Sequence, residues 1–183
     1  MKQEDVSFLP YSNHFLPKSR GPRLSVSLFA VQCGKCFKWR VIPTQEEYEE
    51  IRHSFTDDPF TCNKKTDTTC EEPADIEYDE TRTWVVDKPN IPKTPTGFKR
   101  GLTLRRDYSR MDAYYTVPNG NKKVRAPAEV EKFLEDNPQY KEAGVSVSDF
   151  NFVTPKVMED TIPKDVEVGS SAKRMKMSKQ EEE

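Results

Sequence analysis

The spacing of apolar positions in the first half of the chain predicts two strands and a helix. Residues 24–30 (LSVSLFA) alternate in part between apolar and polar, as a strand with one buried face does. Residues 37–43 (FKWRVIP) are typical of a strand that ends at a proline. Between Thr44 and Phe55 the apolar residues share one helical face, and Thr44 with Glu47 forms a capping box, so a helix is predicted there.

The second half of the chain predicts a hairpin, a helix and one more strand. Residues 98–105 and 112–117 are interpreted as two strands. A helix begins near Pro127, carries its apolar residues on one face and ends at Asn137. Residues 145–153 (VSVSDFNFV) alternate again and are expected to form a strand that covers this helix. The proline-rich residues 81–96 connect the two halves, and Trp84 within them is expected to pack against one half.

The composition favours two small modules over one large core. Of the 183 residues, 33% are charged, 34% are hydrophobic and 14 are prolines, which is a lean supply of core residues for one domain of this length. We therefore predict an α+β protein with modules at residues 25–78 and 79–155, between a loosely ordered N-terminus (1–24) and a disordered tail (156–183). No apolar run approaches membrane-spanning length, so no membrane partner is expected.

Charge is segregated along the chain, although the net charge is only −2. Residues 45–80 contain 13 acidic and three basic residues, whereas residues 93–125 contain nine basic and two acidic residues. The first stretch should attract basic partners and the second should attract polyanions. Two solvated faces of opposite sign, without specific partners, are the alternative interpretation.

The four cysteines carry the clearest candidate chemistry. Cys33, Cys36, Cys62 and Cys70 lie in a short segment that offers little apolar material for a core, and a metal ion is the simplest way to stabilise it. Four thiolates complete the tetrahedral shell of Zn²⁺, so we predict one structural zinc ion and a reducing compartment. Two disulfides are one alternative, although residues 1–10 show no signal-peptide pattern. Redox chemistry at Cys33 and Cys36 is the other, although the βαβ frame it needs is not predicted.

The residues around these cysteines resemble the CW-type zinc finger. The resemblance covers about residues 28–75 and rests on VQCGKCFKWRVIP at 31–43, on Cys62 and on CEEP at 70–73. It implies a zinc-stapled fold and, commonly, a tryptophan cage that binds methylated lysine of a histone tail by cation–π attraction. The two usual cage positions hold Ala30 and Phe60. A histone tail is therefore one candidate partner, and a structural or protein-docking role is the alternative.

The region from about Trp84 to Val153 resembles the methyl-CpG-binding domain, and its join to a CW finger is similar to one branch of the plant members. The resemblance implies an antiparallel sheet packed on one helix, and binding to double-stranded DNA. It rests on Gly97-Phe98, Leu104-Arg105-Arg106, Asp112-Ala113-Tyr114-Tyr115, Pro118-Asn119-Gly120, Arg125, the predicted helix and Ser148-Asp149-Phe150-Asn151-Phe152.

Arginine chemistry explains how such a domain can read a CpG step. Guanine offers O6 and N7 in the major groove, and a guanidinium can bond both while lying against the methyl group of the neighbouring 5-methylcytosine. By the resemblance, Arg105 and Arg125 are the two guanine readers, Asp112 orients Arg105, and Tyr114 contacts one methylcytosine. The other basic positions are expected to contact phosphate: Lys99, Arg106, Arg110, Lys122 and Lys123.

Three features leave the ligand of this region open. The loop at 106–110 is shorter than is typical, Met111 stands where a second tyrosine is common, and an extra residue lies between Gly120 and Arg125. Selective binding of methyl-CpG, DNA binding that ignores methylation, and a scaffold that contacts only proteins remain as alternatives.

These features predict a nuclear chromatin protein without catalytic activity. The resemblance implies that it binds DNA at methylated CpG and recruits partners, such as a chromatin-modifying complex, that repress transcription. The alternative is an interaction scaffold within such a complex. No nucleophile–base pair or phosphate-cradling glycine loop is found in the sequence, so no enzyme is expected. The basic residues at 173–179 of the tail suit a nuclear import signal.

Overall fold

The computed structural model describes residues 6–10, 24–118 and 120–165 of the chain. Three helices are present in this part, α1 (Gln45–Ser54), α2 (Pro127–Asp136) and α3 (Pro138–Glu142), with 3-10 turns at Cys62–Lys64, Val147–Asp149 and Glu159–Thr161. The strands are β1 (Val6–Pro10), β2 (Leu24–Gln32), β3 (Trp39–Ile42), β4 (Val85–Asp87), β5 (Lys99–Leu104), β6 (Met111–Thr116), β7 (Lys123–Val124) and β8 (Lys156–Val157).

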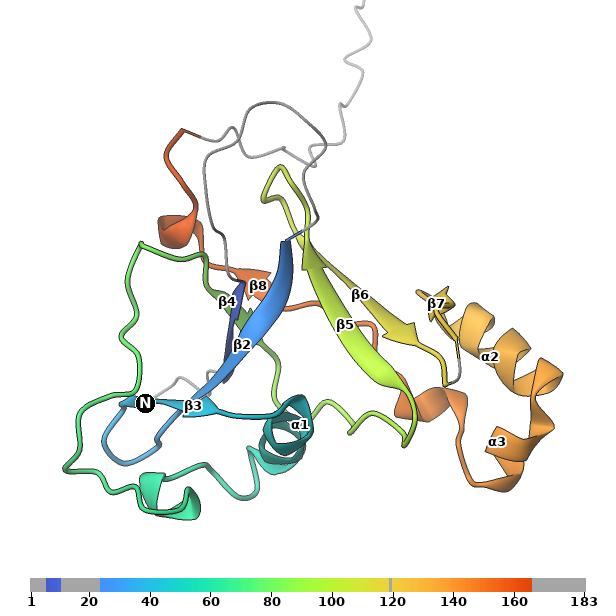
Figure 1. Cartoon of the computed structure of the whole chain (residues 1–183), viewed down its shortest axis with the longest axis horizontal. Coiled ribbons are helices and arrows are strands. Elements are labelled where there is room, and N and C mark those ends of the chain that lie inside the picture. The colour runs from blue at the N-terminus through green and yellow to red at the C-terminus, as the bar shows by residue number, and fades with distance from the viewer. Residues whose placement is uncertain (1–5, 11–23, 119, 166–183) are drawn as a thin grey trace, which may run out of the picture.

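These strands form one continuous antiparallel sheet that runs through both predicted modules (Figure 1). Its order is β7-β6-β5-β2-β1-β4-β8, and β3 also pairs with β2. The long strand β2 makes the connection. Its first residues pair with β5, Leu24 with Leu104 and Ser25 with Thr103, and its later residues pair with β3 beside the cysteines. The finger and the second module are therefore joined by backbone hydrogen bonds.

One hydrophobic core also spans both modules. Tyr48, Phe55 and Phe60 of the finger pack in the same buried cluster as Leu102 and Met111 of the second module. The burial pattern of β6 alternates from Met111 to Thr116, so Met111, Ala113 and Tyr115 face the interior while the residues between them face outward. Helix α1 forms where the sequence predicted it, with Glu47 N donating to the Thr44 hydroxyl at 3.1 Å.

Buried polar contacts hold α1 of the finger against the second module. Arg52 of α1 and Arg100 of β5 both donate to Asp87 Oδ2 of β4, at 3.1 and 3.4 Å. Arg100 also donates to the Val153 carbonyl at 2.7 Å, and Gln45 of α1 donates to the Arg100 carbonyl at 2.7 Å. A buried charge is tolerated only when it is paired and hydrogen-bonded, so these contacts fix the position of α1.

A second core lies under α2 at the other end of the sheet (Figure 1). Val130, Phe133 and Leu134 of α2 are buried against Tyr115 and Phe98. This arrangement confirms the predicted α+β class, with an antiparallel sheet packed on a helix. The helix begins at Pro127, as the sequence predicted, because proline needs no backbone partner in the first turn.

Several elements differ from the sequence-based expectation. Residues 145–153 do cover α2 as expected, since Phe150 is buried in the same cluster as Phe133. They do not form a strand, because Ser146 and Asp149 form a capping box around the 3-10 turn Val147–Asp149. Strands β1, β4, β7 and β8 were not predicted, and β8 extends the ordered chain beyond residue 155. Residues 1–5, 11–23 and the basic residues at 173–179 lie outside the described part. Among the described helices, none is long and apolar enough to cross a membrane.

Candidate metal centre and nucleic-acid interface

The four cysteine sulfur atoms gather at one end of β2, within 4.8 Å of one another. Cys33 and Cys36 come from the turn after β2, Cys62 begins a 3-10 turn, and Cys70 lies in the loop beyond it. The Sγ atoms of Cys36 and Cys62 are 3.6 Å apart, and those of Cys33 and Cys70 are 3.9 Å apart. A tetrahedron with Zn–S bonds of about 2.3 Å has sulfur–sulfur edges of about 3.8 Å, whereas a disulfide needs about 2.05 Å. The geometry thus fits one zinc ion and excludes disulfides.

Two cations of the segment Lys38-Trp39-Arg40 lie beside this thiolate cluster. Arg40 is 1% exposed, and its Nε donates to Cys62 Sγ at 3.1 Å. Its two terminal nitrogens donate to Asp75 and to carbonyl groups of the loop that carries Cys70. Lys38 Nζ donates to the Cys70 carbonyl at 2.8 Å. These cations offset the negative charge of four thiolates and fix the loop that supplies the fourth ligand.

The thiols differ in how strongly they hold their protons. Burial, together with hydrogen bonds to neighbouring thiols, raises the pKa of Cys70 to about 12. For Cys33, burial acts to raise the pKa, but hydrogen bonds from the backbone N–H groups of Cys36 and Lys35 outweigh it and lower the pKa to about 6. Metal binding requires all four thiolates, so it must release protons, and zinc affinity is expected to fall as the pH falls.

The expected cage positions of the finger do not offer aromatic surface. Ala30 is 0% exposed and Phe60 is 2% exposed. The remaining tryptophan, Trp39, packs on Trp84 with ring centroids 5.5 Å apart, and Tyr78 packs on the same Trp84 at 5.0 Å. Trp84 is fully buried, as the sequence predicted for the connector. This aromatic cluster therefore attaches the connector to the finger.

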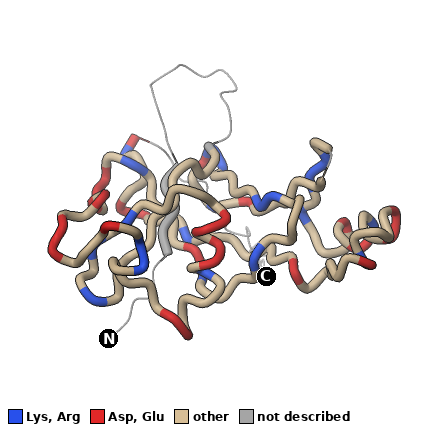
Figure 2. The backbone as a smooth tube through the Cα atoms, turned by 60° about the horizontal axis from the view of Figure 1, so that its bottom comes forward, with Lys and Arg blue, Asp and Glu red and all other residues tan. Residues whose placement is uncertain are grey.

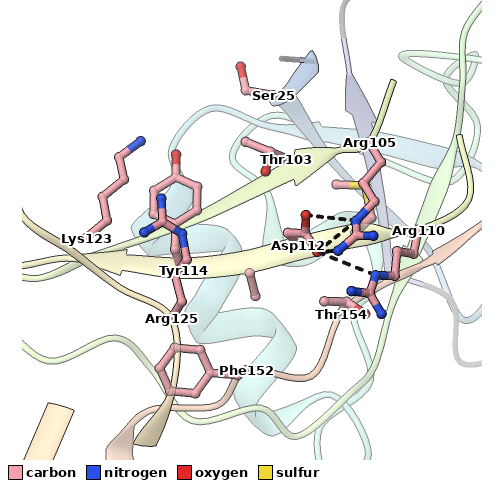
Figure 3. Close-up of a pocket in the computed structure, with 12 residues that line it drawn as sticks. Ser25, Thr103, Arg105, Arg110, Asp112, Tyr114, Lys123, Arg125, Phe152 and Thr154 are labelled. Carbon is pink, nitrogen blue, oxygen red and sulfur yellow. Dashed lines mark hydrogen bonds and ion pairs between the residues drawn. The ribbon is translucent and has the colours of Figure 1, made fainter. Parts of the chain in front are cut away.

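The outward face of β5 and β6 opens into a pocket of about 630 Å³, the reader pocket (Figure 3). It brings together six of the nine residues predicted to contact DNA: Arg105, Arg110, Asp112, Tyr114, Lys123 and Arg125. The β-pairing explains why residues so far apart in sequence meet, since Thr103 lies opposite Asp112 and Gly101 lies opposite Tyr114. Lys99, Arg106 and Lys122 do not line this pocket.

Asp112 holds Arg105 in a two-pronged contact. Arg105 Nε donates to Asp112 Oδ2 at 3.1 Å and Arg105 Nη2 donates to Oδ1 at 3.1 Å. Arg110, which directly precedes β6, adds a longer ion pair to the same carboxylate at 3.6 Å. Figure 3 shows both contacts at one end of the pocket. The Arg105 side chain is still 41% exposed, so it is oriented but open to a ligand.

Arg125 and Tyr114 form the opposite end of the pocket (Figure 3). The Arg125 backbone N–H donates to Glu129 Oε2 at 2.6 Å, which ties the residue to the first turn of α2. Among the described residues, the Arg125 guanidinium has no carboxylate within ion-pair distance. Lys123 Nζ lies 4.1 Å from the centroid of the Tyr114 ring, in cation–π geometry.

Six other residues line the reader pocket that the sequence did not identify as site residues: Ser25, Thr103, Met111, Ala113, Phe152 and Thr154. Ser25 reaches it because β2 pairs with β5, a contact for which the sequence carries no local signal. Phe152 packs edge-on against Tyr115, 5.3 Å between centroids, and brings residues 152–154 beside β6. The alternation of Phe150 and Phe152 with polar residues is visible in the sequence, but it was interpreted as the pattern of a strand.

The segregation of charge has a spatial counterpart (Figure 2). Acidic positions between residues 46 and 80 lie on α1 and the loops of the finger, whereas the basic positions between 93 and 125 lie on β5 and β7 and in the loops beside the strands. The reader pocket thus lies on the positively charged part of the sheet, as an interface for a polyanion requires.

Comparison with known proteins identifies both parts of the chain. The profile of the CW-type zinc finger matches residues 29–76, and the profile of the methyl-CpG binding domain matches residues 84–160. Methyl-CpG-binding domain-containing protein 4 of Arabidopsis thaliana is 55% identical over 93% of this chain and 89% of its own length. Protein 1 of the same series and organism is 49% identical over 88% of this chain and 78% of its own length. No solved structure matches the chain. With the sulfur geometry, these matches support one structural zinc ion.

Proposed function

The chain belongs to the family of methyl-CpG-binding domain-containing proteins, and we propose that it binds duplex DNA at methylated CpG steps in the nucleus and represses transcription through recruited partners. The family supports DNA binding and a role in chromatin. Selectivity for the methyl mark, nuclear location and repression are the parts that belong to the proposal.

The observation that carries the proposal is the clamp between Asp112 and Arg105. Two N–H···O contacts of 3.1 Å leave the guanidinium little freedom to rotate. A guanidinium held in one plane can direct its remaining N–H groups to O6 and N7 of one guanine and lie beside the neighbouring methyl group. An arginine that served only a phosphate would not need such a fixed plane, since phosphate offers acceptors over a wide range of directions.

Arg125 is the second reader in this proposal, and Tyr114 contacts a methylcytosine between the two arginines. A CpG step places one guanine on each strand, so two arginines from opposite ends of one pocket can each meet one guanine. Arg110 and Lys123 at the pocket, with Lys99, Arg106 and Lys122 outside it, supply phosphate contacts that add affinity without sequence information.

The finger contributes structure and protein contacts in this proposal. Ala30 and Phe60 are buried, so the positions that carry a cage in the family cannot enclose a methylated lysine side chain. The acidic loops of the finger lie away from the reader pocket and remain accessible to a basic segment of a chromatin-modifying complex.

Replacing both readers tests the proposal. The double variant Arg105→Met and Arg125→Met should bind methylated and unmethylated duplexes with nearly equal affinity, because each two-pronged guanine contact contributes about 1–3 kcal/mol of discrimination. Arg82→Met is the matched control, since Arg82 is exposed and lies outside the pocket. A double variant that kept the full methylation preference would exclude these arginines as readers, and a wild-type chain that bound neither duplex would favour a scaffold that contacts only proteins.

A further inference from the structure

Strand β5 places a glycine directly opposite the tyrosine of the proposed DNA site. Gly101 pairs with Tyr114 across β5 and β6. A Cβ atom on residue 101 would lie 2.2 Å from Tyr114 Cζ, and 2.5 Å from both Cε2 and the hydroxyl oxygen. The phenol therefore lies across the sheet above the Gly101 backbone, in space that any other side chain would occupy.

Backbone conformation does not explain this glycine. Gly101 is not among the glycines with positive φ, which in the described part are Gly97 and Gly144. Glycine inside a strand lowers stability relative to alanine, and its presence there marks the close approach of another group. The group that approaches Gly101 is the Tyr114 phenol.

The contact of Lys123 with the Tyr114 ring also favours the orientation in which the phenol lies across β5. Lys123 Nζ lies 4.1 Å from the ring centroid. The ring also lines two cavities, the reader pocket and a second cavity of about 280 Å³ bounded by β2, α1 and β5. Because the ring separates these cavities, its tilt determines how far the hydroxyl extends into the reader pocket.

We propose that Gly101 is a positioning residue that sets selectivity for methyl-CpG by allowing the Tyr114 phenol to lie across β5. This inference rests on the proposed contact between Tyr114 and methylcytosine. With a side chain at position 101, the phenol must rotate off the sheet, and its hydroxyl leaves the position at which it meets the methylated base. Gly101 itself does not line the reader pocket, so the arginine readers and the phosphate contacts stay in place.

Gly101→Ala tests the inference through the ratio of dissociation constants for unmethylated and fully methylated duplexes. The ratio should fall by about three- to tenfold, the value of one hydrogen-bond contact, while affinity for unmethylated DNA is unchanged. Tyr114→Ala should lower the ratio equally, and the combined variant should lower it no further. Gly34→Ala is the matched control, because its Cβ would meet Phe60 O at an ordinary 3.5 Å.

Thermal unfolding tests independently whether a Cβ atom at residue 101 clashes with the Tyr114 ring. Gly101→Ala should lower the melting temperature, and adding Tyr114→Ala should restore part of the loss because the new Cβ then has room. Lys123→Met is a second variant, which frees the ring without adding an atom at Gly101, and it should also lower the ratio. A folded Gly101→Ala protein with an unchanged ratio would overturn the inference. If Tyr114→Ala leaves the ratio intact while Arg105→Met abolishes it, the role of Gly101 fails and the proposed function stands.

Discussion

Arg52 of α1 and Asp87 of β4 form an ion pair of 3.1 Å in which the side chains are 1% and 0% exposed. Arg100 of β5 joins the same carboxylate oxygen at 3.4 Å. The three residues come from the finger, the connector and the second module, so the contact links all three segments in the interior. With the pairing of β2 and β5 and the shared core, it makes the finger a structural part of the DNA-binding half.

Asp87→Asn should lower the free energy of unfolding by about 3–5 kcal/mol, because it leaves two buried guanidinium groups without a carboxylate. Urea denaturation of the zinc-loaded chain measures this change. Glu50→Gln is the control, since the Glu50 pair with Lys93 has side chains 64% and 50% exposed and should contribute less than about 1 kcal/mol. Equal effects of the two substitutions would argue against a stabilising junction.

Zinc removal should abolish DNA binding as well as folding of the finger. The protein is expected to hold one zinc ion per chain, and Cys62→Ser should release it. Because β2 continues from the finger to Ser25 in the wall of the reader pocket, the loss should reach Arg105 and its neighbours. Metal analysis and DNA binding of Cys62→Ser check this together; a zinc-free variant with wild-type DNA affinity would contradict it.

Arg40→Gln should weaken zinc binding by about 10–100-fold, the usual effect of removing a partner of a metal ligand. Its Nε–H bond to Cys62 Sγ stabilises the thiolate, and glutamine cannot supply that charge. Competition with a chelator measures the affinity. Lys65→Gln serves as the comparison, because the Lys65 side chain contacts Asp75 and, among the described residues, donates no hydrogen bond to a cysteine sulfur. Similar zinc affinities for both variants would exclude the proposed role of Arg40.

Alkaline pH should weaken the contact between the finger and the C-terminal segment. Burial and a hydrogen bond of 2.7 Å donated to Asp160 raise the pKa of Tyr78 to about 12. Since an unfolded tyrosine has a pKa of about 10, the stability from this group is complete below pH 10 and is lost as the pH rises toward 12. In Tyr78→Phe, the decrease in folding stability between pH 10 and pH 12 should be smaller, because this group no longer ionises. The difference in tyrosinate absorbance between wild type and variant should titrate near 12; a midpoint near 10 would contradict the contact.

The sequence predicted the elements whose signals are local. Thr44 caps α1 and Pro127 begins α2, and both helices form within one or two residues of the expected positions. The cysteine cluster also followed from the sequence, because four cysteines in a segment with little apolar core predict a shared zinc ion. The structure confirms the two helices and the cysteine cluster, whereas the role of Asp112 beside Arg105 was implied by the resemblance and stays a proposal.

The remaining features depend on contacts between distant segments. Strands β4 and β8 have three and two residues, too few for an alternation pattern, and they pair only because the sheet brings them together. The continuous sheet was missed because nothing near Leu24 indicates a partner near Leu104. The strand expected at residues 145–153 fails for a different reason. The Ser146 and Asp149 side chains accept hydrogen bonds from backbone N–H groups of the same turn, so these groups do not pair with another strand despite the alternation of apolar residues.

Selective binding of methyl-CpG is tested most directly by measuring the affinity of the full chain for one short duplex with a single CpG. The duplex is compared in unmethylated, hemimethylated and fully methylated forms, at several salt concentrations. Binding should be tightest to the fully methylated duplex, and this preference should persist as salt rises, because guanine and methyl contacts do not depend on counterion release. Equal affinity for all three duplexes, falling steeply with salt, would mean that the arginines of the reader pocket contact phosphate alone.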